Sequence, residues 1–279
     1  MNRRHFVQTL AALPLAGCVG ARAQSGTRKL SRVGVQLYTL RDDARRDLEG
    51  TLAAIRAAGY DDVELLGSMN NFGMAPARLR DVLDRVGLRA PSTHVAFAAI
   101  DTQLDRTLDE AATLGHEYVT VASIPGDRTR TVDGWRALAD RFNEAGAVAR
   151  RRNVWVGFHN HAGDIKSVAG GYDAFIERTD RAVTRHQLDT GNMAMAGIDP
   201  LAYMRRFGDR YWQFHIKDVP RLGAEADTEL GKGVIDFRAL LRMMDRIDEK
   251  HLYVEQETYP GAPVESARRD QAYLRQLEF

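Results

Sequence analysis

Histidine and carboxylate side chains recur where short apolar runs end in the second half of the sequence. His159 and His161 follow one run, Asp189 ends the next, and His215 and Glu255 end the following two. Their side chains carry nitrogen and oxygen atoms of the kind that bind divalent transition metals. Burying such groups together is costly, and a bound cation offsets that cost. The pattern therefore predicts a metal site assembled from several segments of the chain.

The predicted ligand set contains neither sulfur nor a full shell of oxygen atoms. The sequence has one cysteine, which excludes a thiolate cluster. A lone His or Asp at a strand end is usually a hydrogen-bonded structural group, whereas four at consecutive strand ends favour a shared ligand. We predict one divalent ion (Mn²⁺, Co²⁺, Zn²⁺ or Fe²⁺) rather than the all-oxygen sites of Ca²⁺ or Mg²⁺. Its ligands would be His159, Asp189, His215 and Glu255.

Further polar side chains fall on the same strand faces as these ligands. Side chains alternate along a strand, so Lys217 shares the face of His215, and Glu257 shares the face of Glu255. The candidates for moving protons are Glu255, His161, Lys217 and Glu257. Lys217 could instead be a surface charge at a strand end. The candidate substrate contacts are Gln36, Glu64, His94 and Asn160, although each alone also fits a structural group.

These residues need a fold in which many strand ends meet. Eight short apolar runs alternate with amphipathic helical patterns after residue 31. The predicted strands are residues 33–38, 62–66, 89–94, 118–123, 154–159, 185–189, 211–215 and 252–257, and the predicted helices include 48–58, 104–114, 135–152, 237–247 and 266–277. Gly59, Gly87 and Gly115 follow helices, where a left-handed C-cap is favoured. Eight such units predict an α/β fold, the (β/α)8 TIM barrel, with its active site at the C-terminal strand ends.

The alternative arrangement is a doubly wound open sheet, but no Gly-x-Gly-x-x-Gly turn follows the first strand. The sixth helix, residues 200–207, is the weakest unit of the barrel because it is short. No linker rich in Pro, Gly or Ser interrupts residues 32–279, so a single catalytic domain is predicted there. Residues 230–233 (Leu-Gly-Lys-Gly) either cradle a phosphate before a helix or form a flexible substrate loop.

The first 23 residues have the three parts of an export signal. Arg3 and Arg4 form a twin-arginine pair, an apolar run follows at residues 10–19, and a small-residue cleavage site precedes Gln24. The run is shorter than the roughly 20 residues that span a bilayer. The segment resembles a Tat signal, which predicts export to the periplasm. Cys18 lies in a lipobox-like sequence, so a lipid anchor at Cys18 and cleavage after Ala23 are the two alternatives.

The charge balance restricts the classes of partner. The 39 basic residues exceed the 38 acidic ones by a single charge, so there is no general electrostatic case for a nucleic acid. A hydrophobic content of 44% is typical of a globular protein and excludes disordered and fibrous classes. The expected partner is a small sugar, keto-sugar or glycoside, and a homo-oligomer is compatible with the sequence.

Four motifs in order also carry a resemblance. Gly-Phe-His-Asn-His at residues 157–161, Leu-Asp-Thr-Gly-Asn at 188–192, His-Ile-Lys-Asp at 215–218 and Val-Glu-Gln-Glu at 254–257 resemble the sugar phosphate isomerase/epimerase family, which has the xylose isomerase-like TIM barrel. Related ketose epimerases and inosose dehydratases hold their metal with Glu, Asp, His and Glu, which correspond here to His159, Asp189, His215 and Glu255. Because His159 replaces a Glu that also acts as an acid–base group, the two-Glu mechanism of those epimerases does not transfer.

The chemistry implied by this set is enolisation of a sugar-like carbonyl compound. A cation polarises the carbonyl and stabilises the enediolate left when a base removes the α-proton. Reprotonation gives an epimer or an isomer, whereas loss of a β leaving group makes the enzyme a lyase or dehydratase. We predict a metal-dependent isomerase or epimerase. Since sugar phosphates are cytoplasmic, export favours an unphosphorylated sugar or a 3-keto-glycoside, and a 3-keto-glycoside lyase is the leading alternative.

Two other classes use the same barrel. Endonuclease IV shares the strand-end ligands, but it needs three zinc ions and a basic DNA-binding face, and the net charge and the export signal both argue against it. A sugar-binding barrel without catalysis would be favoured by loss of the ligand set. The sequence keeps that set, so an enzyme is predicted.

Overall fold

The structure is a computed structural model that describes residues 27–279. The predicted export signal, including Cys18, lies outside the described residues. The described chain begins beside its C-terminus, because Arg28 and Phe279 exchange backbone hydrogen bonds of 2.7 and 3.0 Å. In this part of the chain, none of the helices combines the length and the apolar composition needed to cross a membrane.

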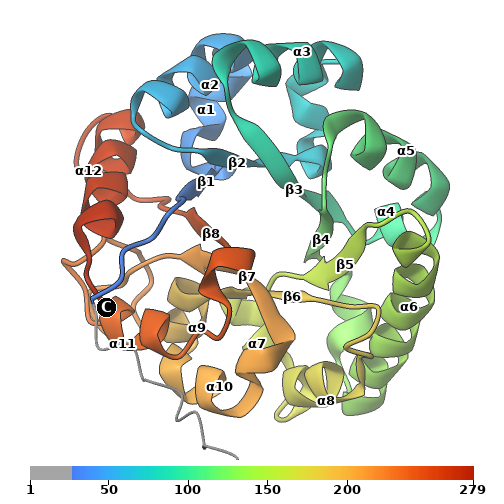
Figure 1. Ribbon diagram of the computed structural model, residues 1–279. Coiled ribbons are helices and arrows are strands. Elements are labelled where there is room, and N and C mark those ends of the chain that lie inside the picture. Colours follow the sequence, from blue (N-terminus) through green and yellow to red (C-terminus); the bar gives the residue numbers. More distant parts are fainter. Residues whose placement is uncertain (1–26) are drawn as a thin grey trace, which may run out of the picture.

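Eight parallel strands form the centre of the molecule (Figure 1). They are β1 (Gly34–Gln36), β2 (Asp62–Leu66), β3 (Arg89–Ala96), β4 (Tyr118–Ser123), β5 (Trp155–Phe158), β6 (His186–Asp189), β7 (Tyr211–Ile216) and β8 (His251–Val254). Their order in the sheet is β5-β4-β3-β2-β1-β8-β7-β6. Isolated parallel bridges join Val156 to Thr184 and His159 to Gln187, and these bridges bring β5 and β6 together. The sheet is therefore a nearly closed barrel, which confirms the predicted fold class.

The seam between β5 and β6 depends on a residue without a side chain. A Cβ atom at Gly157 would collide with the backbone carbonyl oxygen of Arg185. The guanidinium of Arg185 stacks on Trp155 of β5 and on Trp212 of β7, 3.8 and 3.5 Å from the ring centroids. The segment leading into β6 is thus held to both neighbouring strands, and the seam places His159 beside Gln187.

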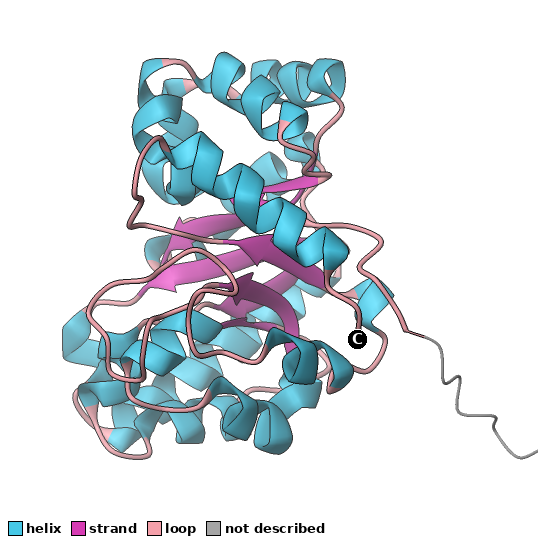
Figure 2. Cartoon of the chain, turned by 90° about the vertical axis from the view of Figure 1, so that its left-hand side faces the viewer, coloured by secondary structure: helices cyan, strands magenta, loops and turns pink. Residues whose placement is uncertain are grey.

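Helices surround the barrel (Figure 2). They are α1 (Arg41–Arg46), α2 (Leu48–Ala57), α3 (Pro76–Val86), α4 (Ala98–Asp101), α5 (Leu104–Leu114), α6 (Val132–Arg150), α7 (Ala162–Ser167), α8 (Gly171–Arg178), α9 (Thr190–Met195), α10 (Pro200–Phe207), α11 (Phe237–Arg242) and α12 (Pro263–Gln276). Apolar side chains on their inner faces pack against the strands. For example, Phe142 of α6 contacts Phe158 of β5 edge to face, with ring centroids 6.1 Å apart.

Most predicted elements are present, and the C-cap prediction is confirmed. Gly87 and Gly115 cap α3 and α5 with φ of 75° and 77°. The predicted helix 237–247 is wrong in its second half, because α11 ends at Arg242 and Arg246 takes a left-handed conformation with φ of 51°. The predicted strand 252–257 is also too long. After β8 the backbone leaves the sheet, and Gln256 N donates to the side chain of Thr39 instead.

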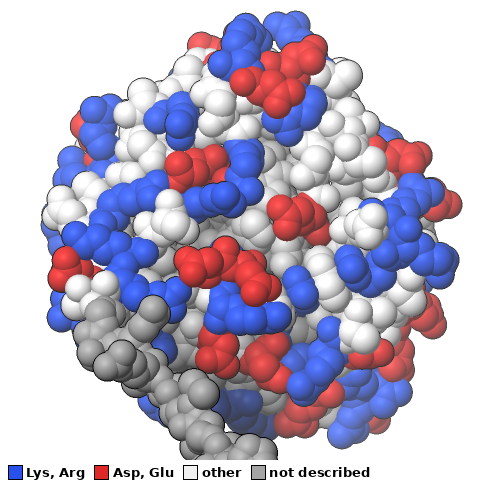
Figure 3. All heavy atoms as spheres, viewed as in Figure 1, with Lys and Arg blue, Asp and Glu red and all other residues white. Residues whose placement is uncertain are grey.

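Charges of both signs mix on the face turned toward the viewer in Figure 1. Figure 3 shows Lys and Arg interspersed with Asp and Glu across this face. Many surface charges are paired between neighbouring helices: Arg178 of α8, for example, donates two hydrogen bonds to Asp140 of α6, of 2.7 and 2.8 Å. Exposed pairs of this kind contribute little to stability, about 0–1 kcal/mol. Their effect is to balance the local charge.

Candidate metal centre

The four predicted ligands lie together at the C-terminal ends of β5 to β8. His159 follows β5, Asp189 ends β6, His215 belongs to β7, and Glu255 follows β8. One donor atom from each side chain lies within 4.8 Å of those of the other three, and all four residues are buried. We call these residues the metal-site cluster. The alternation of side chains along each strand is what turns all four inward.

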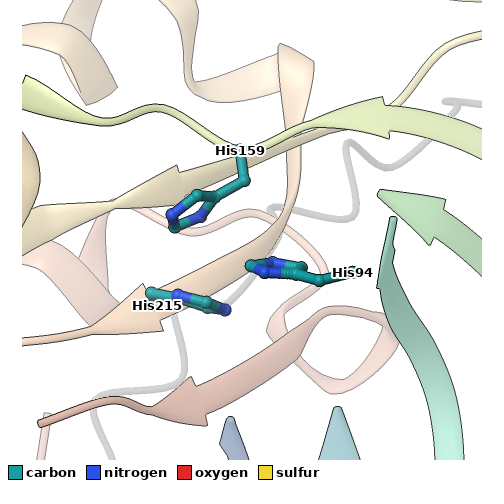
Figure 4. A group of neighbouring side chains, drawn as sticks. All are labelled: His94, His159 and His215. Carbon is teal, nitrogen blue, oxygen red and sulfur yellow. The ribbon is translucent and has the colours of Figure 1, made fainter. Parts of the chain in front are cut away.

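A third imidazole joins the two histidines of the cluster. His94 lies near the end of β3, and its ring centroid is 4.7 Å from that of His159 and 5.0 Å from that of His215. In Figure 4 the three rings, from β3, β7 and the end of β5, point toward one another. These three histidines also form a group that could hold a metal ion. The sequence singled out His94 only as a candidate substrate contact.

The donor chemistry of the cluster fits a divalent cation. Nδ1 of His159 is buried and has no hydrogen-bond partner among the described residues, so a ring nitrogen is left for a ligand. The buried carboxylates of Asp189 and Glu255 contact the buried ammonium of Lys217, and the buried carboxylate of Glu64 contacts His215. A metal ligand must be a neutral imidazole, so metal binding at His215 requires loss of a proton there. With His215 neutral, these three carboxylates and one ammonium leave two negative charges, which one divalent cation would balance.

Lys217 lies inside the barrel and not at the surface. Its side chain is 1% exposed, and Nζ lies 2.7 Å from Glu255 Oε2, 3.3 Å from Asp189 Oδ2 and 2.8 Å from Glu257 Oε1. Burial alone would lower the pKa of Lys217, but the charges of Asp189, Glu255 and Glu257 outweigh it and raise the pKa well above its ordinary value. Lys217 is therefore a buried ammonium held by three carboxylates.

The carboxyl and imidazole groups of the cluster shift one another in the same way. Burial would raise the pKa of Glu255, but Lys217 and His215 outweigh it and hold that pKa well below the usual range. Burial would lower the pKa of His215, but Glu255 and Glu64 outweigh it and hold that pKa well above the usual range. Burial keeps the pKa of His159 well below its ordinary value. The neutral imidazole of His159 has the lone pair that a metal ligand needs.

The other two proton-transfer candidates lie at the outer edge of the cluster. The side chains of His161 and Glu257 are 51% and 41% exposed. The His161 ring centroid lies 4.6 Å from that of His159, and its Nδ1 lies 3.5 Å from Asp164 Oδ2. Burial would lower the pKa of His161, but the hydrogen bond and charge of Asp164 outweigh it and raise that pKa. These two side chains are the members of the candidate set that solvent reaches most readily.

The candidate substrate contacts are more deeply buried than the sequence suggested. Gln36, Glu64 and Asn160 each have 0% exposure, and His94 has 5%. Asn160 is bonded to the backbone of Asp189: its Oδ1 accepts from Asp189 N at 3.0 Å, and its Nδ2 donates to Asp189 O at 3.3 Å. Asn160 thus joins the ends of β5 and β6, while Gln36 and Glu64 lie below the metal-site cluster and bond to each other.

The sequence analysis missed two carboxylates that shape the rim. Asp227 accepts hydrogen bonds from the backbone N–H groups of Glu257 and Thr258, at 2.6 and 2.8 Å, and so positions Glu257. Asp218 accepts four backbone N–H bonds, of 2.9 to 3.2 Å, from Val219, Gly231, Gly233 and Ile235. Residues 230–233 are therefore ordered by Asp218, which takes the N–H groups of both glycines that a phosphate would need. In the sequence, Asp218 stood out only as the last residue of the His-Ile-Lys-Asp motif.

Comparison with known proteins agrees with the barrel fold. Residues 52–277 match the model of the xylose isomerase-like TIM barrel. The chain belongs to that family. It is 26% identical over 161 residues to the inosose dehydratase of Clostridium perfringens, which covers 51% of this chain and 54% of that relative. The chain thus spans about half the length of the Clostridium relative it matches. His159 and the three other ligand candidates lie inside residues 52–277, the range that the family model matches.

Solved structures share the fold. A sugar phosphate isomerase/epimerase from Parabacteroides distasonis superposes with a TM-score of 0.76 at 23% identity, covering 92% of this chain and 98% of that one. The 3-keto-D-glucoside 4-epimerase of E. coli superposes with a TM-score of 0.65 at 17% identity, covering 88% and 99%. The IolI protein, solved with a bound zinc atom, gives a TM-score of 0.70 at 15% identity, covering 86% and 95%. At these identities the likeness establishes the barrel.

Proposed function

We propose that this protein is a metal-dependent enzyme that isomerises or epimerises a sugar or keto-sugar through an enediolate intermediate. The observation that carries the proposal is the buried metal-site cluster beside proton-transfer groups that reach solvent. The family relatives act on sugar-like molecules, such as the inosose dehydratase of Clostridium perfringens. A zinc atom in the IolI protein supports a divalent metal in this fold.

Different residues of this chain have different roles in the proposed reaction. His159, Asp189, His215 and Glu255 would hold the cation. When bound, the cation supplies Lewis-acid chemistry: it lowers the cost of negative charge on a carbonyl oxygen. Glu255 is the candidate base for the α-proton, Glu257 and His161 are the candidates to exchange protons with solvent, and the ammonium of Lys217 orients the carboxylates around it.

A 3-keto-glycoside lyase or dehydratase is the second candidate function. The same removal of an α-proton leads to elimination when a leaving group sits β to the carbonyl. Two observations support this candidate: the inosose dehydratase relative and the structural likeness to a 3-keto-D-glucoside 4-epimerase. The two candidates differ in their products, which are an isomer or epimer in one case and an unsaturated or dehydrated sugar in the other.

One experiment tests the proposal and separates the candidates. The metal-loaded protein is incubated in D₂O with keto-sugars and keto-glycosides, and products are followed by NMR. Enolisation requires deuterium at the carbon α to the carbonyl, in the product or in the recovered substrate. Turnover without deuterium in either pool, together with a nicotinamide requirement, would indicate hydride transfer and would overturn the proposal.

We also propose that the enzyme is exported by the Tat route to the periplasm. The proposal rests on Arg3, Arg4 and the apolar run that follows them in the sequence. Fractionation should find the protein outside the cytoplasm, and changing Arg3 and Arg4 to Lys should retain it inside. Mass spectrometry of the mature N-terminus distinguishes a lipidated Cys18 from a free Gln24. A wild-type protein that stays in the cytoplasm would contradict export.

A further inference from the structure

Glu64 is a fully buried carboxylate that lies beneath the metal-site cluster. It belongs to β2, has 0% exposure, and its oxygens lie close to side chains of four other strands. Oε1 accepts from Ser92 Oγ at 2.6 Å and from Gln187 Nε2 at 2.9 Å. Oε2 accepts from Gln36 Nε2 at 2.7 Å. With these bonds, Glu64 is enclosed by protein donors and is not positioned to touch a substrate.

The remaining contacts of Glu64 Oε2 are to two imidazoles of the site. His215 Nε2 lies 2.5 Å away, and His94 Nε2 lies 3.2 Å away. An ionised carboxylate can only accept hydrogen bonds. Both oxygens of Glu64 already accept from side-chain donors, so Glu64 serves as an acceptor here. Nε2 of each ring must therefore carry a hydrogen to bond with it.

Gln187 reinforces the same arrangement at His94. Because Gln187 Nε2 donates to Glu64 Oε1, the amide is oriented with its oxygen toward the imidazole. That oxygen, Oε1, lies 2.8 Å from His94 Nε2. An amide oxygen is also only an acceptor. Glu64 thus acts on His94 twice, once directly and once through the orientation of the Gln187 amide.

The opposite nitrogen of His215 faces the metal-site cluster. His215 Nδ1 lies 3.0 Å from Glu255 Oε2 and 3.7 Å from Asp189 Oδ2, so without metal it also faces acceptors, and a bound cation would take the place of its proton. We propose that Glu64 is a positioning residue that fixes the Nε2–H tautomer of both His215 and His94, so that Nδ1 of His215 provides the lone pair for the metal. Metal-binding imidazoles usually donate their other N–H to a carboxylate or carbonyl, which orients the ring and raises its basicity.

This inference rests on the proposed metal site only for His215. The tautomer of His94 can be measured with no metal present, so the two ideas can fail separately. Long-range ¹H–¹⁵N NMR of histidine-labelled wild-type protein distinguishes Nε2–H from Nδ1–H rings. We expect His94 as the Nε2–H tautomer without metal, and His215 with Nε2–H and a zinc-ligated Nδ1 after zinc is added. An Nδ1–H ring at His94, or zinc on Nε2 of His215, would overturn the inference.

A variant pair tests the strength of the effect. Glu64→Gln keeps the size of the side chain but can no longer accept at both oxygens, so we expect zinc affinity to fall by about 10- to 100-fold and the His94 resonances to lose the single Nε2–H form. Asp62→Asn is the matched control: Asp62 is a buried carboxylate on the same strand, bonded to Arg89 and 3.9 Å from His251 Nδ1, away from the cluster.

The outcomes separate positioning from general stability. The control Asp62→Asn breaks a buried ion pair, so it should be less stable than the wild type. It should still keep the zinc affinity and the His94 tautomer of the wild type. Equal loss of zinc affinity in Asp62→Asn and Glu64→Gln would show a structural role only and would overturn the inference. Failure of Glu64→Gln to fold still leaves the wild-type tautomers to decide it. Absence of zinc binding in a wild type whose His94 is the Nε2–H tautomer would defeat the proposed function and leave the role of Glu64 at His94 intact.

Discussion

The ammonium of Lys217 and the carboxylate of Glu255 are in direct contact, with Nζ 2.7 Å from Oε2. Nζ also lies 3.3 Å from Asp189 Oδ2. Lys217 therefore places one positive charge against the carboxylates of two of the four candidate ligands. A divalent cation at the cluster would share these oxygens with the ammonium, so the two positive charges should oppose each other's binding.

We expect Lys217→Met to bind divalent metal more tightly than the wild type, because one competing positive charge is gone. Without metal, the variant should be less stable by about 3–5 kcal/mol, since it leaves buried carboxylates uncompensated. Denaturant unfolding with and without a chelator measures the second effect, and competition titration measures the first. Lys232→Met is the control, because Lys232 is 63% exposed and pairs with Glu229, away from the metal-site cluster. Weaker metal binding by Lys217→Met would show that Lys217 supports the site.

Removal of a ligand should remove the metal. Elemental analysis of the wild type should find close to one equivalent of a transition metal per chain, and His215→Ala should lose it. Loss of one ligand also strands a buried carboxylate, so the stability of the variant should fall by a few kcal/mol. Full metal occupancy in the double variant Asp189→Ala, His215→Ala would place the metal elsewhere in the protein.

Much of the barrel could be predicted because its signals are local. The C-cap glycines Gly87 and Gly115 lie where the helices end, and α10 occupies the predicted residues 200–207. The predicted element boundaries are wrong where the backbone forms hydrogen bonds with side chains distant in the sequence. The segment after β8 leaves the sheet because Thr39 and Asp227 accept its N–H groups, and neither partner can be inferred from residues near β8.

The site shows the same division. The sequence predicted that His159, Asp189, His215 and Glu255 lie together. This was possible because the alternation of inward and outward side chains can be followed within each strand. Glu64 lies below these four residues, and its contacts with β3, β6 and β7 depend on how the strands are staggered around the barrel. That stagger is a property of the closed barrel and not of any one segment. Parity could have identified Gln187 as an inward neighbour of Asp189, but its pairing with Glu64 joins residues 123 positions apart.

The loop after β7 should depend on Asp218. Its carboxylate accepts hydrogen bonds from Gly231 and Gly233, among others, and it is 0% exposed. Asp218→Ala would leave these buried N–H groups unpaired, at a cost of about 1–3 kcal/mol for each hydrogen bond to a charged group. Hydrogen exchange should show lost protection at residues 231–235 while β7 stays protected. Unchanged protection of Gly231 and Gly233 would mean that other contacts hold the loop.

Asp270 should make stability depend on pH. It lies in α12 with 1% exposure, and its Oδ2 has no hydrogen-bond partner among the described residues. Burial raises its pKa to about 7, against a partial opposing effect of the bond from Leu230 N. A carboxyl whose folded pKa is raised stabilises the protein most below its unfolded pKa of about 4, and this stabilisation is lost as the pH rises toward 7.

Asp270→Asn should therefore be more stable than the wild type at pH 8, and its unfolding free energy should vary less between pH 4 and 7. A wild type and variant with parallel pH profiles would contradict the raised pKa.

The sharpest prediction concerns the base that removes the α-proton. Glu255 is 5% exposed and contacts both His215 and Lys217. Glu257 lies further out, where its carboxylate contacts Lys217. Glu255→Gln keeps the size of the side chain and one oxygen ligand but removes the base, so turnover and deuterium exchange should both fall by at least ~10²-fold with metal still bound.

Glu257→Gln is the matched variant, because it makes the same change on the same segment. If Glu255 is the base, Glu257→Gln should keep most of the exchange at the α-carbon. Glu255→Gln could instead merely weaken metal binding and recover its activity in excess metal. In that case the base is Glu257 or His161, and only the variant that removes the true base, Glu257→Gln or His161→Gln, should abolish exchange. Measuring exchange and metal content on the same samples separates these outcomes, because a lost base stops proton removal at full metal occupancy and a lost ligand does not.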